Sequence, residues 1–87
     1  MCGIAGIAKS SYSVDITSKN VASMCRIMRH RGPDNTTVSS YPHVVFGHNR
    51  LSLIDLSDRS NQPFENESSA LVFNGEIYNY LELKADL

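Results

Sequence analysis

The segment from Cys2 to Ala8, Cys-Gly-Ile-Ala-Gly-Ile-Ala, constrains the fold most, because it is apolar, short and rich in small residues. The polar run Lys9-Ser10-Ser11 follows it at once. A short apolar run with such a boundary is typical of a strand buried on both faces, and small side chains allow other elements to pack closely against it. The sequence therefore predicts that the chain begins with a core strand.

A helix is predicted after this strand. Apolar residues recur there at helical spacing: Val21, Met24, Ile27 and Met28. Thr17 is the expected N-cap, with Ile16 placed to pack on Val21 as a hydrophobic staple. Gly32-Pro33 is expected to stop the helix.

Short strands are predicted in the second half of the chain. Residues 36–40 and 43–49 form an expected hairpin with a tight turn at Tyr41-Pro42. Residues 58–69 are an expected polar loop, and residues 70–73 a further apolar strand.

A second helix is predicted from Asn79, because Asn79 and Glu82 resemble a capping box. Ile77, Leu81 and Ala85 would lie along one stripe of it. The chain ends after about two turns of this helix, too few for a stable helix by itself. We therefore expect the polypeptide to be a fragment of a longer domain.

The composition, 41% hydrophobic and 20% charged over 87 residues, is that of one small globular domain. The net charge is −1 and no Lys or Arg cluster could neutralise a run of phosphates, so nucleic acid is not an expected partner. No apolar stretch approaches the roughly 20 residues of a membrane span, so no membrane association is expected. No signal peptide is recognisable either, so we expect a cytoplasmic chain whose two cysteines remain thiols.

Cys2 is the most informative candidate for chemistry. Removal of Met1 would make it the N-terminal residue, with a free amine beside its thiol. An α-amino group titrates near ~7.7 to 8.0 and a thiol near ~8.5, so the amine can accept the thiol proton at neutral pH. The alternative is an inert small cysteine buried at the start of a core strand.

Asn74-Gly75 also has two interpretations. The pair is a strong hairpin-turn signal. It could instead form an oxyanion hole, because an Asn side-chain amide and a Gly backbone N–H can both donate to the oxygen of a tetrahedral intermediate.

Arg50 and Glu76 are candidates for binding a charged substrate. The planar guanidinium of Arg50 suits bidentate capture of a carboxylate, and Glu76 could hold an ammonium group. The alternative for each is a solvated surface charge. No spacing of His and Cys residues indicates a metal site, so no metal is expected in this segment.

Five motifs occur in order: Met1-Cys2-Gly3-Ile4, His30-Arg31-Gly32-Pro33-Asp34, Gly47-His48-Asn49-Arg50-Leu51-Ser52-Leu53-Ile54-Asp55-Leu56, Asn61-Gln62-Pro63-Phe64 and Phe73-Asn74-Gly75-Glu76-Ile77-Tyr78-Asn79. Together they cover essentially the whole chain. The set resembles the glutaminase domain of glutamine-hydrolysing asparagine synthetases, which are class II glutamine amidotransferases. The second and third motifs differ from those of sugar-phosphate and phosphoribosyl amidotransferases, which share the Cys-Gly-Ile start.

The resemblance implies an α+β fold, part of the four-layer αββα sandwich of N-terminal-nucleophile hydrolases. Residues 1–87 would be a partial glutamine amidotransferase domain. The rest of the sandwich, a further acidic residue for the substrate amine and the synthetase domain would be absent. We expect little or no activity from the isolated chain, because working sites hold their groups within roughly 0.5 Å.

The resemblance also implies a mechanism in which Cys2 attacks the side-chain amide of glutamine. The resulting thioester releases ammonia and is then hydrolysed to glutamate. The residues matching the family's site are Cys2 as nucleophile, Asn74 and Gly75 as oxyanion hole, Arg50 for the substrate carboxylate, Leu51, Ser52, Leu53 and Ile54 as the substrate-lining backbone, and Glu76 for the substrate amine.

Glutamine is thus the implied substrate, and a synthetase domain the implied partner. ATP and magnesium would belong to that domain, for the amidation of aspartate, and no cofactor is expected in this segment. The acceptor stays open, since synthetase-like proteins of polysaccharide or peptide-modification pathways carry the same motifs, and so does oligomerisation of a full-length protein. The alternatives are a truncated, non-catalytic or partner-binding piece and an unrelated hairpin-rich binding domain.

Overall fold

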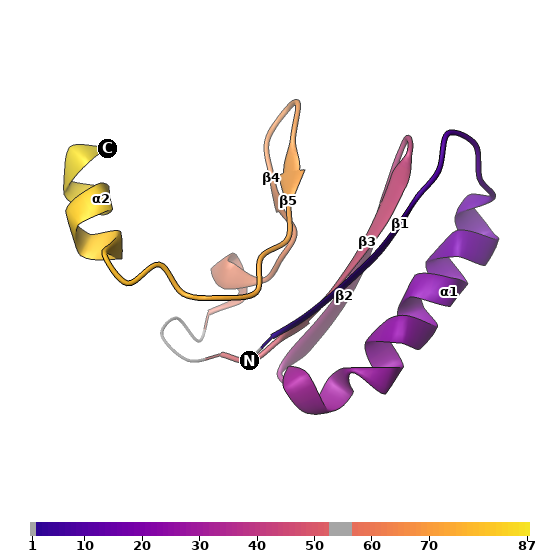
Figure 1. Cartoon of the computed structure of the whole chain (residues 1–87), viewed down its shortest axis with the longest axis horizontal. Coiled ribbons are helices and arrows are strands. Elements are labelled where there is room, and N and C mark those ends of the chain that lie inside the picture. The colour runs from indigo at the N-terminus through magenta and orange to yellow at the C-terminus, as the bar shows by residue number, and fades with distance from the viewer. Residues whose placement is uncertain (1, 53–56) are drawn as a thin grey trace.

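A three-stranded antiparallel sheet lies at the centre of the computed structural model, which describes residues 2–52 and 57–87 (Figure 1). Its strands are β1 (Gly3–Ala8), β2 (Asn35–Tyr41) and β3 (Val44–Arg50), in the order β1-β3-β2. Because β3 pairs with both neighbours, its end at Arg50 lies beside the start of β1, where Gly3 faces Asn49. This register places the N-terminus of the chain at the end of the central strand.

The helix α1 (Val14–Ile27) covers one face of this sheet (Figure 1). Val21 and Cys25 of α1 and Val45 of β3 form the fully buried apolar core, with exposed fractions of at most 1%. A Cβ atom on Gly47 would lie 2.4 Å from the Cys25 sulfur and 2.8 Å from Val21 Cγ1. The absence of a side chain at Gly47 is therefore what lets the helix approach the central strand.

The first strand is confirmed, but its predicted burial on both faces is wrong for the residues that the structure describes. Burial alternates along β1: Ala5 and Ile7 pack against the core, whereas Ile4 is 45% exposed. A single covering helix shields only one face of the sheet. The sequence of β1 is apolar throughout because small residues occupy both of its faces, not because two layers cover it.

The first helix begins one turn earlier than predicted. Ser13 is the N-cap, and its hydroxyl accepts a hydrogen bond from the Ile16 amide at 3.5 Å. Thr17 is a buried residue inside the helix, and Ile16 is 64% exposed, so neither the predicted cap nor the predicted staple forms. Both hydroxyl residues suit a cap, but starting at Ser13 adds a full turn to the packed helix.

The helix also ends earlier, at Ile27, and a 3₁₀ turn, η1 (Arg29–Arg31), leads to Gly32. Gly32 approaches the end of β3 so closely that a Cβ atom there would lie 2.2 Å from the Asn49 carbonyl oxygen. The glycine thus permits a backbone crossing as well as ending the helical segment.

The predicted β2-β3 hairpin is confirmed. Tyr41 pairs with Val44, so the two turn residues are Pro42 and His43, one position later than predicted. A second, shorter hairpin joins β4 (Phe64–Glu65) to β5 (Ala70–Leu71), after the 3₁₀ turn η2 (Asp58–Ser60). Its first strand lies in the segment predicted to be only a loop, and its second is shorter than the predicted 70–73.

The second helix, α2 (Tyr80–Asp86), stands apart from the sheet in Figure 1. Asn79 occupies the N-cap position, but its side chain makes no capping hydrogen bond, so the predicted capping box is not formed. Every side chain of α2 is exposed, and Leu81 is 67% exposed. The radius of gyration is 14.0 Å, against about 12 Å for a compact domain of this length. Neither of the helices within residues 2–52 and 57–87 is long and apolar enough to cross a membrane.

Candidate active site around Cys2

The sulfur of Cys2 meets the backbone of Leu51, just beyond the end of β3. The Leu51 amide donates to Cys2 Sγ at 3.3 Å, and Sγ lies 3.8 Å from the Leu51 carbonyl oxygen, to which the thiol can donate. The antiparallel register of β1 and β3 creates this contact. Cys2 is half-buried, and an amide N–H directed at its sulfur stabilises negative charge there.

The segment around η1 fixes the backbone on both sides of this contact. Arg31 Nε donates to the Cys2 carbonyl oxygen at 3.2 Å. The Asp34 amide donates to the Arg50 carbonyl oxygen at 2.9 Å, and Asp34 Oδ2 accepts from the Ser52 amide at 2.7 Å. The sequence does not place Arg31 or Asp34 in the site, although the His30–Asp34 motif contains both, because a motif does not say which backbone groups its side chains bind.

Arg50 is buried, with 6% of its surface exposed, so the alternative of a solvated surface charge is wrong. Its Nη1 donates to the Ser57 carbonyl oxygen at 2.6 Å and to Asn61 Oδ1 at 2.9 Å. The guanidinium therefore joins the end of β3 to the segment that leads into β4.

Gln62 extends this connection to the segment that follows β5. Its Nε2 donates to the Phe73 carbonyl oxygen at 3.1 Å, and the Phe73 amide donates to Gln62 Oε1 at 2.5 Å. Gln62 is 9% exposed, so the two bonds are shielded from water. These two hydrogen bonds hold Phe73, and with it the neighbouring Asn74, against the segment that Arg50 binds through Ser57 and Asn61. Gln62 has no role in the sequence-based site either, since only its place in the Asn61–Phe64 motif marked it.

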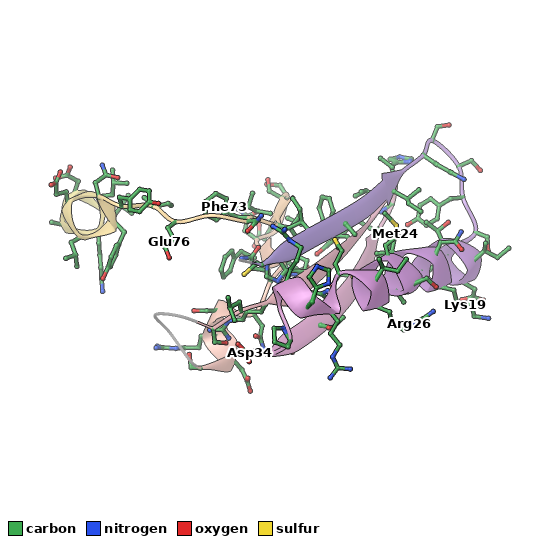
Figure 2. The ribbon with its side chains drawn as sticks, turned by 60° about the horizontal axis from the view of Figure 1, so that its bottom comes forward. Lys19, Met24, Arg26, Asp34, Phe73 and Glu76 are labelled. Atoms are coloured by element: carbon green, nitrogen blue, oxygen red, sulfur yellow. The ribbon has the colours of Figure 1, made fainter. Side chains whose placement is uncertain are left out.

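Asn74 is half-buried, and its Oδ1 atom is buried without a hydrogen-bond partner. Gly75 and Glu76 are exposed. The alternative of a hairpin turn at Asn74-Gly75 is wrong, because the chain bends at Gly75 and runs on to α2 without a second strand. Figure 2 shows Phe73 beside the sheet and Glu76 farther out, on the segment that leads to α2.

The predicted site residues thus fall into three groups. Cys2, Arg50, Leu51 and Ser52 lie together at the end of β3. Asn74 is connected to them through Phe73, Gln62 and Asn61, whereas Glu76 stands apart. Leu53 and Ile54 lie outside the described residues.

His48 lies two residues before Arg50 on β3 and is fully buried. Neither ring nitrogen makes a hydrogen bond of normal geometry. Burial lowers the pKa of His48 below its usual 6.5, and the charge of Arg50 lowers it further. A hydrogen bond with the backbone of Phe73 raises the pKa but does not outweigh these two effects. The imidazole is therefore neutral at pH 7.

The other cysteine, Cys25, is 1% exposed in the core, and burial raises the pKa of its thiol. Within residues 2–52 and 57–87, no three His, Cys, Asp or Glu side chains are grouped as metal ligands. The residues gathered at the end of β3 are instead a thiol, backbone amides and a buried guanidinium, a set suited to nucleophilic attack on an amide or ester.

The chain belongs to the glutamine amidotransferase domain family, whose signature matches residues 1–87. It is 37% identical over 91 residues to asparagine synthetase [glutamine-hydrolyzing] 1 of Bacillus subtilis, covering 100% of this chain and 14% of that protein. It is 42% identical over 91 residues to asparagine synthetase [glutamine-hydrolyzing] 2 of the same organism, covering 100% of this chain and 12% of the relative.

A third relative is asparagine synthetase B [glutamine-hydrolyzing] of Escherichia coli, which is 34% identical over 88 residues, 99% of this chain and 16% of that protein. The chain therefore spans between 12% and 16% of the length of these three curated relatives. No solved structure matches the chain significantly.

Proposed function

We propose that the chain is the nucleophile-bearing part of a glutaminase that hydrolyses glutamine to glutamate and ammonia, with Cys2 as its catalytic nucleophile. The observation that carries this proposal is the 3.3 Å contact between the Leu51 amide and the Cys2 sulfur, next to the buried Arg50. Similarity over the whole chain to glutamine-hydrolysing asparagine synthetases supports it.

In the proposed reaction, the α-amine of Cys2, free after removal of Met1, accepts the thiol proton. The sulfur attacks the side-chain amide carbon of glutamine, and the amide oxygen becomes an oxyanion. Donation from Asn74 and Gly75 stabilises that oxyanion. The intermediate expels ammonia, which takes a proton from the α-ammonium group, and leaves a glutamyl thioester on Cys2.

Hydrolysis of the thioester uses the same amine. It deprotonates a water molecule, whose oxygen attacks the thioester carbon through a second oxyanion. Collapse of this intermediate releases glutamate and returns the proton to the sulfur. No atom of the enzyme is consumed, and the net reaction is glutamine plus water giving glutamate plus ammonia.

Arg50 is the proposed ligand of the substrate carboxylate, with the backbone from Leu51 to Ile54 lining the bound molecule and Glu76 contacting its amine. Two of the bonds that Arg50 makes within the protein leave from Nη1. Such bonds hold the planar guanidinium in one orientation, which a bidentate contact requires. Glu76 would need to move toward the sheet to take this role, since its segment leads away from Phe73 (Figure 2).

We propose further that residues 1–87 are part of a glutamine amidotransferase domain with the four-layer αββα architecture. The exposed apolar side chains support this, among them Ile4 at 45%, Leu81 at 67% and Tyr78 at 91%. Apolar surface of this kind is expected where further protein packs. By the same similarity, a linked synthetase domain using ATP and magnesium would pass the ammonia to aspartate in the cytoplasm.

The test is covalent labelling with an electrophilic diazo-ketone analogue of glutamine, followed by mass spectrometry of the chain. We expect loss of Met1 and one adduct, on Cys2, that excess glutamine suppresses. The matched control is the same chain with its α-amine acetylated, which should not react. Labelling of Cys25 instead, or equal labelling of the acetylated chain, would overturn the proposal.

A further inference from the structure

Asn74-Gly75 places two groups next to each other that can react together. The Cγ atom of an asparagine is an amide carbon, and the backbone nitrogen of the next residue can close a five-membered ring on it. A side chain on that next residue hinders the approach, whereas glycine has none. Every other asparagine is followed by a residue with a side chain: Asn20 by Val21, Asn35 by Thr36, Asn49 by Arg50, Asn61 by Gln62, Asn66 by Glu67 and Asn79 by Tyr80.

The carboxamide oxygen of Asn74 is not held by the protein. Its Oδ1 atom accepts no hydrogen bond from the residues that the structure describes. In contrast, Asn66 Oδ1 accepts from the Ser68 and Ser69 amides at 3.0 and 2.8 Å, and Asn61 Oδ1 accepts from Arg50 at 2.9 Å. No hydrogen bond to Oδ1 therefore has to break before the Asn74 carboxamide can turn toward the backbone.

The backbone is fixed before Asn74 and exposed after it. Gln62 binds both backbone polar groups of Phe73. Gly75 and Glu76 are exposed, on the segment that leads away from the sheet to α2 (Figure 2). The Gly75 amide donates to no backbone carbonyl in the described part of the chain. Rotation of the peptide between Asn74 and Gly75, which ring closure requires, thus moves the exposed side and breaks no backbone hydrogen bond there.

We propose that Asn74-Gly75 is a site of spontaneous deamidation, with water as the only co-reactant. The Gly75 amide gives its proton to water or hydroxide, and its nitrogen attacks Asn74 Cγ. The bond from Cγ to Nδ2 then breaks, ammonia leaves with a proton taken from the solvent, and a succinimide ring remains. Water opens the ring at one of its two carbonyl carbons and leaves aspartate or isoaspartate at position 74. No electron is transferred in any step.

The modification would disable the proposed oxyanion hole. This consequence rests on the proposed function, whereas the deamidation itself does not. A side-chain carboxyl with a pKa near ~3.9 is ionised at neutral pH, so it accepts hydrogen bonds but donates none, and it repels an oxyanion. Isoaspartate also adds a carbon to the backbone before Gly75, which displaces the second proposed donor.

Mass spectrometry of the aged chain tests the site directly. Trypsin releases residues 60–84 as one peptide that contains Asn61, Asn66, Asn74 and Asn79. After incubation of the folded chain at mildly alkaline pH, we expect conversion at position 74 alone, at a rate that rises with pH because the attacking nitrogen must lose a proton. A folded chain that stays intact at position 74 while the isolated peptide converts would overturn the proposal.

Two substitutions test the chemical and the structural parts of the argument. Gly75→Val should slow conversion by roughly 10-fold or more, because a β-branched side chain crowds the attacking nitrogen. Glu67→Gly creates a second Asn-Gly pair at Asn66, whose carboxamide the Ser68 and Ser69 amides hold. In the folded chain this pair should convert about 10-fold more slowly than Asn74, since a hydrogen bond must break first, and in urea the two rates should become similar. Equal rates in the folded chain would contradict the structural argument.

Labelling by the diazo-ketone analogue tests the consequence for the site. Asn74→Asp reproduces one product and should label about 100- to 1,000-fold more slowly than the unsubstituted chain, as expected when an oxyanion donor is lost. Asn66→Asp, on the exposed β4-β5 turn, is the matched control and should label at the unchanged rate. Iodoacetamide should react equally with Cys2 in all three chains.

The aged chain separates this inference from the proposed function. Its labelling should fall in proportion to conversion at position 74, and unchanged labelling of a converted chain would refute the effect on the site. If even the fresh chain does not label, the proposed function fails. The mass measurements then decide by themselves whether Asn74 deamidates.

Discussion

Asn49 Nδ2 donates to the Cys25 carbonyl oxygen at 2.6 Å, so the central strand binds the backbone of the helix directly. The other end of the same amide, Oδ1, accepts from the Thr36 hydroxyl at 3.1 Å. One fully buried side chain therefore ties β3 to α1 and to β2. Asn49 lies directly before Arg50 and Leu51, at the end of β3 where the strand meets Cys2.

Replacing Asn49 by Leu is expected to lower the free energy of unfolding by about 1–3 kcal/mol, because the buried Cys25 carbonyl would lose its side-chain donor. Urea denaturation followed by circular dichroism measures this. Ser23→Ala is the control: it removes hydrogen bonds on the exposed face of α1 and should change stability by less than about 0.5 kcal/mol. Equal effects of the two substitutions would contradict the assigned role of Asn49.

Gly47→Ala should also destabilise the chain, by about 1–3 kcal/mol, because the added Cβ would fall 2.4 Å from the Cys25 sulfur. Removing the obstructing sulfur in a Gly47→Ala, Cys25→Ala double variant should recover part of the loss. Gly6→Ala is a milder comparison, with its nearest contacts at 3.3 Å. Thermal unfolding of these three variants, of Cys25→Ala and of the unsubstituted chain tests the order, and additive effects at positions 47 and 25 would show that the contact is absent.

Arg50→Lys should weaken capture of the diazo-ketone analogue of glutamine. A lysine cannot keep the bonds to Ser57 and Asn61 and also offer a planar pair of donors. Loss of a hydrogen bond to a charged group, about 1.5–3 kcal/mol, corresponds to a rise of roughly 10- to 100-fold in the half-saturating concentration of the analogue. Arg26→Lys, on the exposed side of α1, should leave that concentration unchanged.

Stability should depend on pH through His48. Its folded-state pKa lies below the unfolded value of 6.5, so the unfolded chain binds this proton first as pH falls. The contribution of His48 is fully present above pH 6.5 and is lost as pH decreases below it, until the folded-state pKa is passed. Denaturation at about pH 7.5 and about pH 5.5 should show the unsubstituted chain losing stability relative to His48→Gln. A constant difference between the two chains would refute this.

Gln62→Ala should free the segment after β5 while leaving the sheet intact. Both backbone groups of Phe73 would lose their partner. Hydrogen exchange should accelerate at the Phe73 amide and remain slow in β3. Gln62→Glu keeps the acceptor for that amide but loses the donor, so it should protect Phe73 more than alanine does.

The sequence predicted the elements of the sheet and of α1 well, because their signals are local. The hairpin of β2 and β3 follows from the turn signal at Tyr41-Pro42 and the apolar run Val44-Val45-Phe46 after it. Of the residues predicted from helical spacing, Val21 lies in the core, whereas Met24 and Ile27 are exposed. The start of α1 did not follow, since Ser13 and Thr17 are both able to cap and only packing on the sheet chooses between them.

The sequence predicted which residues belong to the candidate site, but not which of them contact one another. Cys2 and Leu51 meet only because β1 and β3 pair with one particular register, which no local pattern specifies. The supporting roles of Arg31, Asp34 and Gln62 depend on backbone groups far away in the sequence. Such contacts are set by the tertiary fold, and this is why motifs marked these residues without explaining them.

The strand order has a further consequence for Cys2. Among the described residues, β1 is hydrogen-bonded along one side only, to β3, whereas β3 is paired on both sides. Peripheral strands fray more readily than central ones. Brief detachment of β1 would carry the Cys2 sulfur away from Leu51 while Arg50 and Gln62 stayed in place. The nucleophile can therefore leave the candidate site while the rest of the site keeps its geometry.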